Sequence, residues 1–362
     1  MNKGHYIIPI FVPHEGCPHD CVFCNQNSIT GSTTKVNSEF VINTVEEYLK
    51  TIPKADRILE ISFFGGTFTA INIEKQNELL KVAKYYKDLG LVDYIRLSTR
   101  PDYINDNILT NLKNFTVDII ELGVQSLDRE VLKKSARGHS IEDVIMSSKL
   151  IKEYGFVLGH QIMLGLPGDN FEKDIITTKE VIKLSPQICR IYPSLVIKDT
   201  PMEIMYKQGI YKPYSLDEAV HISKVVYGML AANNINVIRL GLQPTEEINE
   251  GGDIIAGPFH AAFRELVEGS ILNDIIKESV PGNYSGMLTI NLNPKDISKL
   301  YTSRKKFFND TKEHLKTINI IVNQRDCVKR GEMMLSFNDN CINVSIYDYL
   351  RNKYKEGDLN IL

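Results

Sequence analysis

Short apolar runs rich in β-branched residues alternate with longer amphipathic segments along the first two thirds of the chain. The runs have the length and residue preference of buried strands, and the segments between them repeat apolar positions at i, i+3, i+4 and i+7, as helices do. The predicted strands are residues 6–12, 58–64, 94–98, 117–124, 157–164, 188–192 and 237–240. The predicted helices are residues 38–50, 74–87, 142–154, 171–184 and 216–233.

This order of elements predicts both the fold class and the edge of the sheet at which chemistry gathers. Strands that alternate with helices form a parallel sheet covered by those helices, so we predict an α/β fold, a partial (β/α)6-type TIM barrel. In such barrels the functional residues lie at the carboxyl ends of the strands. The predicted strands here run into small, polar or charged residues at that end, beginning with a cysteine-containing segment after the first strand.

The pattern changes after about residue 245, where glycines interrupt the chain before a helical segment. Strands are expected near residues 287–292, 318–322, 333–337 and 341–346, around a helix near 303–315. We therefore divide the chain into a core barrel, residues 1–245, and a C-terminal α+β appendage, residues 246–362. The appendage is a candidate for contact with the substrate.

Composition excludes several classes of protein. Of the 362 residues, 43% are hydrophobic and 24% are charged, as in an ordinary folded protein. The formal net charge of -3 gives no overall attraction to nucleic acid or to an anionic membrane, so a polyanionic partner would need a local basic patch. Pro9 and Pro13 interrupt the first apolar stretch, and no later run reaches the ~18 residues of a membrane span. The expected location is cytoplasmic, with no membrane partner.

Three of the six cysteines, Cys17, Cys21 and Cys24, are clustered in the segment CPHDCVFC. A reducing cytosol disfavours a disulfide framework, so these thiols are candidate metal ligands. A closed zinc site needs a fourth ligand, for which His14 and His19 are candidates, and a ferredoxin-type cluster needs a fourth thiolate that no matching run supplies. Three thiolates would instead leave one iron of a [4Fe–4S] cluster open to another ligand.

The spacing Cys-x3-Cys-x2-Cys resembles the signature of the radical S-adenosylmethionine (SAM) superfamily, in which SAM chelates the open iron. The segment FFGGTFT, residues 63–69, resembles the glycine-rich segment that follows the second strand in that family. STRPDYI, ELGVQS, RGH and MLGLPG are together similar to the branch that contains oxygen-independent coproporphyrinogen oxidase and the radical-SAM half of the Elongator catalytic subunit. The Elongator-like similarity extends over roughly residues 5–265.

The resemblance implies a role for each matching residue. Cys17, Cys21 and Cys24 would bind the cluster as metal ligands. The implied SAM-binding residues are Phe23 beside the adenine, Gly65, Gly66 and Thr67 at the methionyl group, Gln125 at the ribose or amine, and Arg137 at the carboxylate. An arginine suits the last task because its guanidinium presents a rigid fork of donors to a carboxylate.

Two positions depart from the pattern of the family. Ser98 stands where relatives often carry a glutamate, and Gln161 stands where the coproporphyrinogen oxidase branch has an aspartate. A neutral side chain makes a hydrogen bond about half as strong as a carboxylate does, so Ser98 and Gln161 are the weaker candidate contacts to SAM. Met163 is a candidate neighbour of the adenine, although a methionine on a strand is commonly a core residue.

The implied cofactors are a [4Fe–4S] cluster and S-adenosyl-L-methionine, and the implied partner is an external electron donor of the flavodoxin or ferredoxin type. Reductive cleavage of SAM would give a 5′-deoxyadenosyl radical, which abstracts hydrogen from a substrate C–H bond. The protein would then supply orientation and exclusion of water, because the cofactor carries the difficult chemistry.

The sequence leaves the substrate open between RNA or tRNA and a small molecule. Residues 299–316 carry six Lys or Arg against two acids, with aromatics between them, as in a phosphate-contacting segment. No Q/R-x-x-G-x-G/A loop for acetyl-CoA occurs, so no acetyltransferase domain is expected. His260, Arg264 and Glu265 are further candidates to face the substrate. The alternative is a non-catalytic zinc- or cluster-binding protein that acts in nucleic-acid binding or electron transfer.

Overall fold

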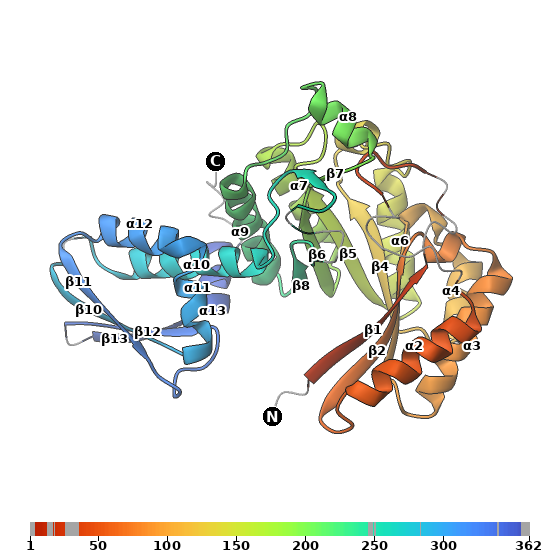
Figure 1. The fold of residues 1–362 in the computed structure, drawn as a ribbon, viewed down its shortest axis with the longest axis horizontal. Coiled ribbons are helices and arrows are strands. Elements are labelled where there is room, and N and C mark those ends of the chain that lie inside the picture. The colour runs from red at the N-terminus through yellow and green to blue at the C-terminus, as the bar shows by residue number, and fades with distance from the viewer. Residues whose placement is uncertain are drawn as a thin grey trace.

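The computed structural model describes residues 4–12, 17, 19–25, 36–244, 249, 251–282, 284–338 and 340–355. Its larger part is a seven-stranded parallel sheet that curls into a half-barrel (Figure 1). The strands are, in their order across the sheet, β1 (Gly4–Val12), β2 (Arg57–Gly65), β3 (Tyr94–Thr99), β4 (Ile119–Gln125), β5 (Val157–Leu164), β6 (Ile188–Pro193) and β8 (Asn236–Leu240). β1 and β8 are the two edge strands and do not pair, which confirms the expected partial barrel.

Helices return the chain between these parallel strands and cover the outer face of the sheet. They are α2 (Ser38–Thr51), α3 (Ile73–Asp88), α4 (Asp106–Asn114), α5 (Arg129–Lys134), α6 (Ile141–Glu153), α7 (Phe171–Leu184) and α9 (Leu216–Ala232). Each begins after an Asn, Asp or Ser whose side chain accepts a hydrogen bond from a first-turn N–H. Local sequence therefore sets where these helices start.

Several central strands alternate between an apolar face and a more polar one. On β2, Leu59, Ile61 and Phe63 are fully buried against the helices, whereas Glu60 and Ser62 lie on the concave side. The same alternation recurs on the neighbouring strands, so the core lies between sheet and helices. The concave face is consequently lined with polar and charged side chains.

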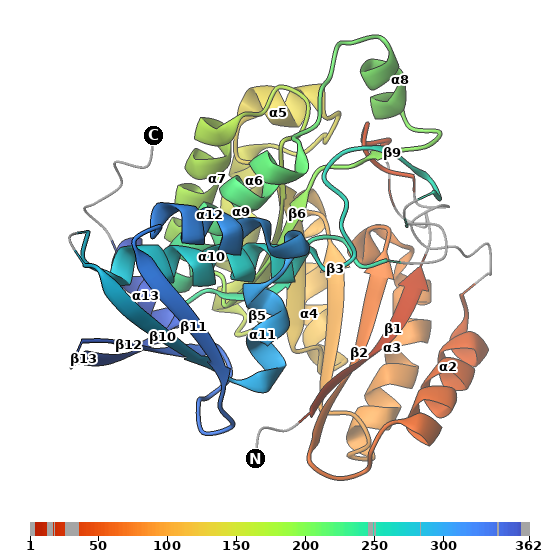
Figure 2. The ribbon, with the colours of Figure 1, turned by 60° about the vertical axis from the view of Figure 1, so that its left-hand side comes forward.

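Two short strands extend beyond the carboxyl end of the sheet. β7 (Val196–Ile197) pairs antiparallel with β9 (Ile254–Ala256), close to the short helix α8 (Pro201–Lys207) (Figure 2). The chain thus returns to the barrel after the predicted boundary at residue 245, which itself lies outside the described residues. The division into residues 1–245 and 246–362 stays a prediction.

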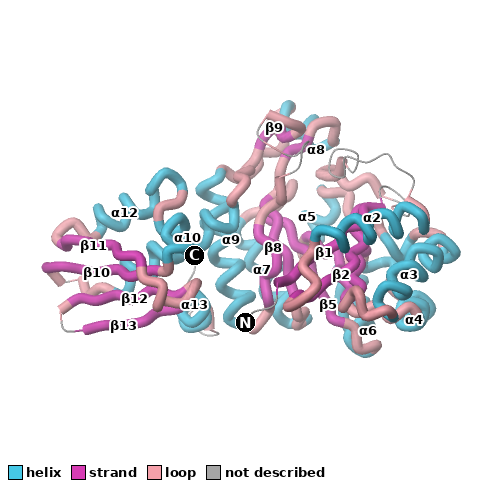
Figure 3. Tube along the Cα trace, turned by 60° about the horizontal axis from the view of Figure 1, so that its bottom comes forward, coloured by secondary structure: helices cyan, strands magenta, loops and turns pink. Residues whose placement is uncertain are grey.

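The C-terminal part forms a second, four-stranded sheet in the order β11-β10-β12-β13, seen at the far end of the molecule in Figure 3. Its elements are α10 (Phe263–Ser279), β10 (Gly286–Leu292), α11 (Ile297–Leu300), α12 (Lys306–His314), β11 (Ile318–Gln324), β12 (Glu332–Phe337), β13 (Asn340–Ser345) and α13 (Ile346–Lys353). α10 and α13 both pack on α9 of the barrel, and one continuous hydrophobic core joins the two parts.

The structure also contains elements that the periodicity did not predict. These are α4, α5, α8, α11, α13, β7 and β9, none of them longer than nine residues, so each displays few repeats of its period. The predicted helix at 303–315 begins only at residue 306, because Ser303, Arg304 and Lys305 all have positive φ. Three consecutive left-handed residues cannot continue a right-handed helix.

The packing of α11 against α10 depends on Gly269, which lies in the middle of α10. A Cβ at this position would lie 2.3 Å from the carbonyl oxygen of Lys299, which is backbone and cannot rotate away. We expect Gly269→Ala to lower the free energy of unfolding by about 1–3 kcal/mol, despite the better helix propensity of alanine. Chemical denaturation measures this difference. Gly282→Ala is the matched control, because nothing lies within 4 Å of its Cβ; equal stability of both variants would contradict the packing described.

Candidate functional site

The cysteine-containing segment follows β1 at the carboxyl edge of the sheet (Figure 2). Its described residues are held by backbone hydrogen bonds to two other segments. The N–H of Val22 donates to the carbonyl of Ser135, after α5, and the carbonyl of Val22 accepts from the N–H of Met202 in α8. The N–H of Cys24 donates to the carbonyl of Cys21 at 3.0 Å and closes a turn between the two cysteines. The fold therefore positions this segment at the expected edge.

Cys21 is buried, and Cys17 and Cys24 are half-buried. Among the described residues, no group of three His, Cys, Asp or Glu side chains is arranged to hold a single metal ion. The donor chemistry nevertheless fits an iron–sulfur cluster, because one short segment carries three thiols. His19 lies against Gly138, and His14 is outside the described residues.

The guanidinium of Arg137 joins this segment to β4. Its Nη1 donates to the Sγ of Cys21 at 3.4 Å and its Nη2 to the carbonyl of Gly123 at 2.6 Å. Its Nε is buried with no partner among the described residues. Burial, and then the charges of Arg137 and Arg100, lower the pKa of the nearby His139 to about 3, so that imidazole is neutral at pH 7. The predicted contact of Arg137 with a SAM carboxylate stays a prediction.

The glycine-rich segment lies directly beside the end of β1. Gly65 has a φ of 108°, and a Cβ there would lie 2.7 Å from the carbonyl oxygen of Val12. The N–H of Gly66 donates to that same carbonyl at 3.0 Å. Only glycine permits this approach, so the ends of β1 and β2 are held together next to the cysteines. Thr67 follows as a buried residue.

Gln125 terminates β4 in a strained conformation. It has a φ of 65° and adjoins a register shift in the pairing with β5. Its Oε1 is buried and has no hydrogen-bond partner among the described residues. A left-handed non-glycine residue costs of order 1–3 kcal/mol, and such residues cluster at ligand sites. An unsatisfied amide oxygen at this edge is consistent with a ligand that donates to it.

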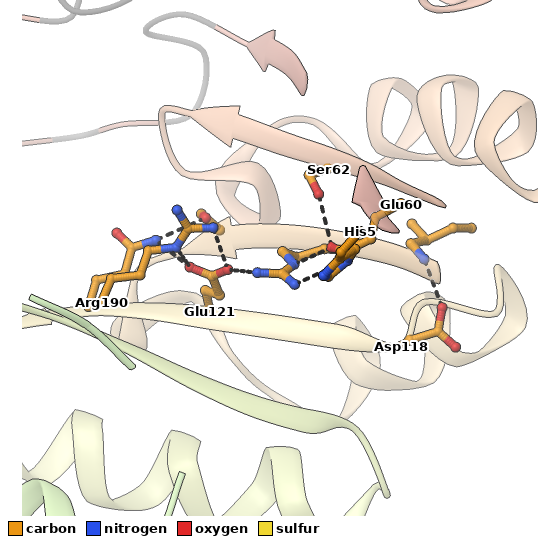
Figure 4. A network of polar contacts seen from close by, with 10 residues as sticks. His5, Glu60, Ser62, Asp118, Glu121 and Arg190 are labelled. Atoms are coloured by element: carbon orange, nitrogen blue, oxygen red, sulfur yellow. Dashed lines mark hydrogen bonds and ion pairs between the residues drawn. The ribbon is translucent and has the colours of Figure 1, made fainter. Parts of the chain in front are cut away.

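A buried network of ion pairs crosses the concave face below this edge (Figure 4). Arg96 on β3 bridges two carboxylates, with Nη2 donating to Glu60 at 2.8 Å and Nη1 to Glu121 at 2.5 Å. Arg190 on β6 donates from Nε and Nη2 to the two oxygens of Glu121, at 2.6 and 3.0 Å. His5 on β1 also contacts Glu60. The network thus extends from β1 to β6 across the sheet.

Glu121 is the centre of this network. Burial alone would raise the pKa of Glu121, but Arg190 and then Arg96 outweigh it and hold that pKa below the usual 4.5. The carboxylate is therefore ionised at neutral pH, and the same interaction raises the pKa of Arg190. Removal of one partner would leave an uncompensated buried charge.

Ser98 and Gln161 belong to the same network. The Nε2 of Gln161 donates to Glu121 at 2.9 Å and to the Oγ of Ser98 at 3.2 Å. Their predicted contacts with SAM stay predictions. Met163 is half-buried on β5, opposite Tyr192 on β6.

The GLPG segment after β5 is held by two tyrosines. Tyr211 donates to the carbonyl of Gly165 at 2.6 Å, and Tyr214 donates to Asp174 at 2.9 Å while its ring lies against Gly165. Burial, and then the charge of Asp169, raise the pKa of Asp174 well above its usual value. The segment is rigidly placed beside the candidate site. Phe23 packs against the small hydrophobic cluster of Val196, Met202 and the same Tyr211.

The charged residues of the concave face were not predicted from the sequence. Glu60, Arg96, Glu121 and Arg190 each occupy an alternate position within a predicted strand. A charge inside an apolar strand is a signal in itself, because a charged side chain is buried only when it is paired. The period-2 pattern could have placed all four on one face, but not identified their partners.

Comparison with known proteins identifies the family. Residues 11–179 match the radical SAM superfamily, and residues 186–272 match the radical SAM C-terminal domain. The chain is 29% identical over 260 residues to the tRNA uridine(34) acetyltransferase of Methanocaldococcus infernus, which covers 61% of this chain and 48% of that protein. It is 29% identical over 196 residues to human Elongator complex protein 3, covering 49% of this chain and 36% of that protein. The chain belongs to the radical SAM superfamily of enzymes and is similar to its Elongator-like members.

A solved structure shows the same fold. The archaeal Methanocaldococcus infernus Elp3 with an N-terminal deletion matches with a TM-score of 0.62 at 22% identity, covering 94% of this chain and 75% of that one. The likeness therefore extends from the barrel into the appendage. The chain spans about half the length of the curated tRNA uridine(34) acetyltransferase that it matches. Among the helices of the described residues, none has both the length and the apolar character needed to cross a membrane.

The ion-pair network predicts a large difference between two glutamate variants. Glu121→Gln removes the charge shared by two buried arginines, and we expect it to lower the free energy of unfolding by about 3–5 kcal/mol. Glu142→Gln removes an exposed ion pair with Arg129 and should cost about 0–1 kcal/mol. Chemical denaturation of both variants at neutral pH measures the two changes. Similar small losses would show that the buried network contributes little.

The pH dependence follows from the direction of the pKa shift. The folded-state pKa of Glu121 lies below 4.5, so its ionised form stabilises the fold above pH 4.5. This contribution is lost as the pH falls below 4.5 toward the folded-state pKa. The stability difference between wild type and Glu121→Gln should therefore be constant near neutrality and shrink in acid. A difference that does not change across the acid range would contradict the assignment.

Proposed function

We propose that this protein is a radical SAM enzyme that holds a [4Fe–4S] cluster on Cys17, Cys21 and Cys24 and cleaves S-adenosylmethionine reductively. The observation that carries the proposal is a continuous chain of contacts at the carboxyl edge of the sheet. Cys21 touches Arg137, and Arg137 touches the backbone of Gly123, two residues before the strained Gln125. Family membership supplies the chemistry that such a site would carry out.

A cluster held by the three cysteines would supply the one electron that cleaves the sulfonium C–S bond of SAM, giving methionine and a 5′-deoxyadenosyl radical that would abstract a hydrogen atom from the substrate. The chain's own residues bind and orient SAM. Gly65 and Gly66 have no side chain, so SAM can approach their backbone closely, and Gln125 offers a buried hydrogen-bond acceptor. The guanidinium of Arg137 donates to the Sγ of Cys21 and so helps to orient that sulfur. An external flavodoxin- or ferredoxin-like donor would supply the electron.

We propose RNA as the substrate class, ahead of a small molecule. The relatives named above as tRNA uridine(34) acetyltransferase and Elongator complex protein 3 support this choice. The basic segment is partly available for phosphates, because Arg304, Lys305 and Lys312 are exposed. Lys299, by contrast, is already paired with Glu268. The reaction proposed here is hydrogen abstraction, without acetyl transfer.

Cysteine variants test the cluster. We expect Cys17→Ala, Cys21→Ala and Cys24→Ala each to lose most bound iron after anaerobic reconstitution, since each removes one of three ligands. Iron and sulfide content and the visible absorption of the cluster measure this loss. Cys327→Ala is the control, because Cys327 is exposed and distant in sequence. Zinc in place of iron in the wild type would favour the zinc-binding alternative.

The same samples test SAM cleavage. Reduced, cluster-loaded wild type and Cys327→Ala should form 5′-deoxyadenosine from SAM, whereas Cys21→Ala should form none. Liquid chromatography of the nucleoside products provides the measurement. A loaded wild-type protein that forms no 5′-deoxyadenosine with dithionite or with flavodoxin would refute the proposed reaction and leave an electron carrier.

A further inference from the structure

Arg239, near the carboxyl end of β8, has no paired counterion among the residues that the structure describes. It stands in register with Arg190 on the neighbouring strand β6. Arg190 directs two of its nitrogens at Glu121, whereas Arg239 makes no side-chain hydrogen bond or ion pair with any residue that the structure describes. Two adjacent guanidinium groups repel each other. The positive charge of Arg239 therefore favours the binding of an external anion at this position.

The environment of Arg239 strengthens this imbalance. The side chain is half-buried, and burial, Arg190 and Arg264 together lower the pKa of Arg239. Tyr192 and Glu121 act in the opposite direction on that pKa, but neither forms an ion pair or hydrogen bond with the Arg239 side chain in the part of the chain that the structure describes. The cost of this charge persists as long as no anion is bound.

Arg239 lines a cavity between the end of β8 and the start of α10. These two elements pack together, and their arrangement can be followed in Figure 1. The cavity encloses about 350 Å³, which is within the range of small-molecule sites. Gly241, with a φ of 83°, lets the chain turn here, and a Cβ at Gly241 would lie 2.8 Å from the Cβ of Phe263. The close approach of the two segments therefore brings the first turn of α10 to the same cavity.

A second guanidinium and the start of a helix lie on the α10 side. Arg264 donates from Nε to Glu268 at 2.8 Å and from Nη1 to the carbonyl of Val237 at 3.0 Å, which fixes it beside the cavity. α10 has no side-chain cap at its start, so first-turn N–H groups have no side-chain acceptor there. Glu265 also lines the cavity, but it is exposed. Solvent therefore screens its repulsion of a bound anion.

We propose that this cavity, at Arg239 and the start of α10, binds a phosphate group of the substrate. An arginine fork and helix N–H groups are the donors that recognise phosphate oxygens. The inference rests on the proposed function in one respect, namely that the phosphate belongs to the molecule acted on at the cysteine site. β1, which leads to the cysteines, and β8, which carries Arg239, are opposite edges of the open sheet, so a substrate anchored here would extend across the concave face.

Arg239→Gln tests the site, with Arg239→Lys as the variant that keeps the charge. The probes are inorganic pyrophosphate and a short single-stranded RNA, titrated by calorimetry at low salt. We expect Arg239→Gln to weaken pyrophosphate binding at least tenfold and Arg239→Lys to weaken it less. For RNA, the slope of log K against log salt should fall by about 1. Arg129→Gln, an exposed arginine on α5, is the control and should bind as wild type does.

Further measurements separate this proposal from the proposed function. Binding of SAM, measured by equilibrium dialysis, should be the same in Arg239→Gln and wild type; a parallel loss of SAM binding would assign Arg239 to the cofactor and overturn the inference. Unchanged pyrophosphate binding in a folded Arg239→Gln protein, or equal affinity for citrate, would also overturn it. Binding of pyrophosphate without RNA would support the site and identify a small phosphorylated substrate. Absence of 5′-deoxyadenosine in the cleavage assay refutes the radical reaction alone.

Discussion

The buried ion pairs on the concave face constrain the rest of the barrel. Glu121 on β4 accepts from Arg96 on β3, from Arg190 on β6 and from Gln161 on β5, and Arg96 continues to Glu60 on β2. A buried charge costs several kcal/mol when its partner is removed, so these strands cannot shift independently. The register of five strands is therefore coupled on a face that contributes no apolar core. Ordinary hydrophobic packing holds the opposite face.

This rigid base explains how a site of loops can be placed accurately. The cysteine segment, the glycines after β2 and the end of β4 have little regular structure of their own. They meet because the strands beneath them end at the same level, and because Val12, Gly123 and Ser135 accept hydrogen bonds from neighbouring segments. Functional loops carried by a fixed scaffold are the usual arrangement in barrels of this kind. The strain at Gln125 is sustained by the same scaffold.

The appendage packs directly against this scaffold, so more than the polypeptide chain connects the two parts. α9 packs against the outer face of the barrel and also contacts α10 and α13, so one hydrophobic core serves both parts. The start of α10 is consequently fixed relative to β8. Arg239 and Arg264 come from segments on either side of the predicted domain boundary, and their shared cavity exists only because of this junction.

Much of the architecture could be read from the chain because it depends on local periodicity. The strand at 157–164 and the helix at 171–184 were predicted at their observed bounds, since alternation and capping by Asn170 are local signals. The helix at 303–315 was misplaced, because left-handed backbone at Ser303 leaves no mark in an amphipathic pattern. α5 was missed because six residues are too few to display a period.

The sequence by itself determined the fold class, the order of strands and the family, because hydrophobic period and motif spacing are properties of neighbouring residues. It also supplied the candidate ligands Cys17, Cys21 and Cys24. Only the tertiary structure decided that Arg137 touches Cys21, that Glu121 neutralises two arginines, and that Arg239 forms no ion pair within the described part of the chain. These are contacts between residues far apart in the chain, and the balance of charge among them depends on distance and burial, which one-dimensional patterns do not contain.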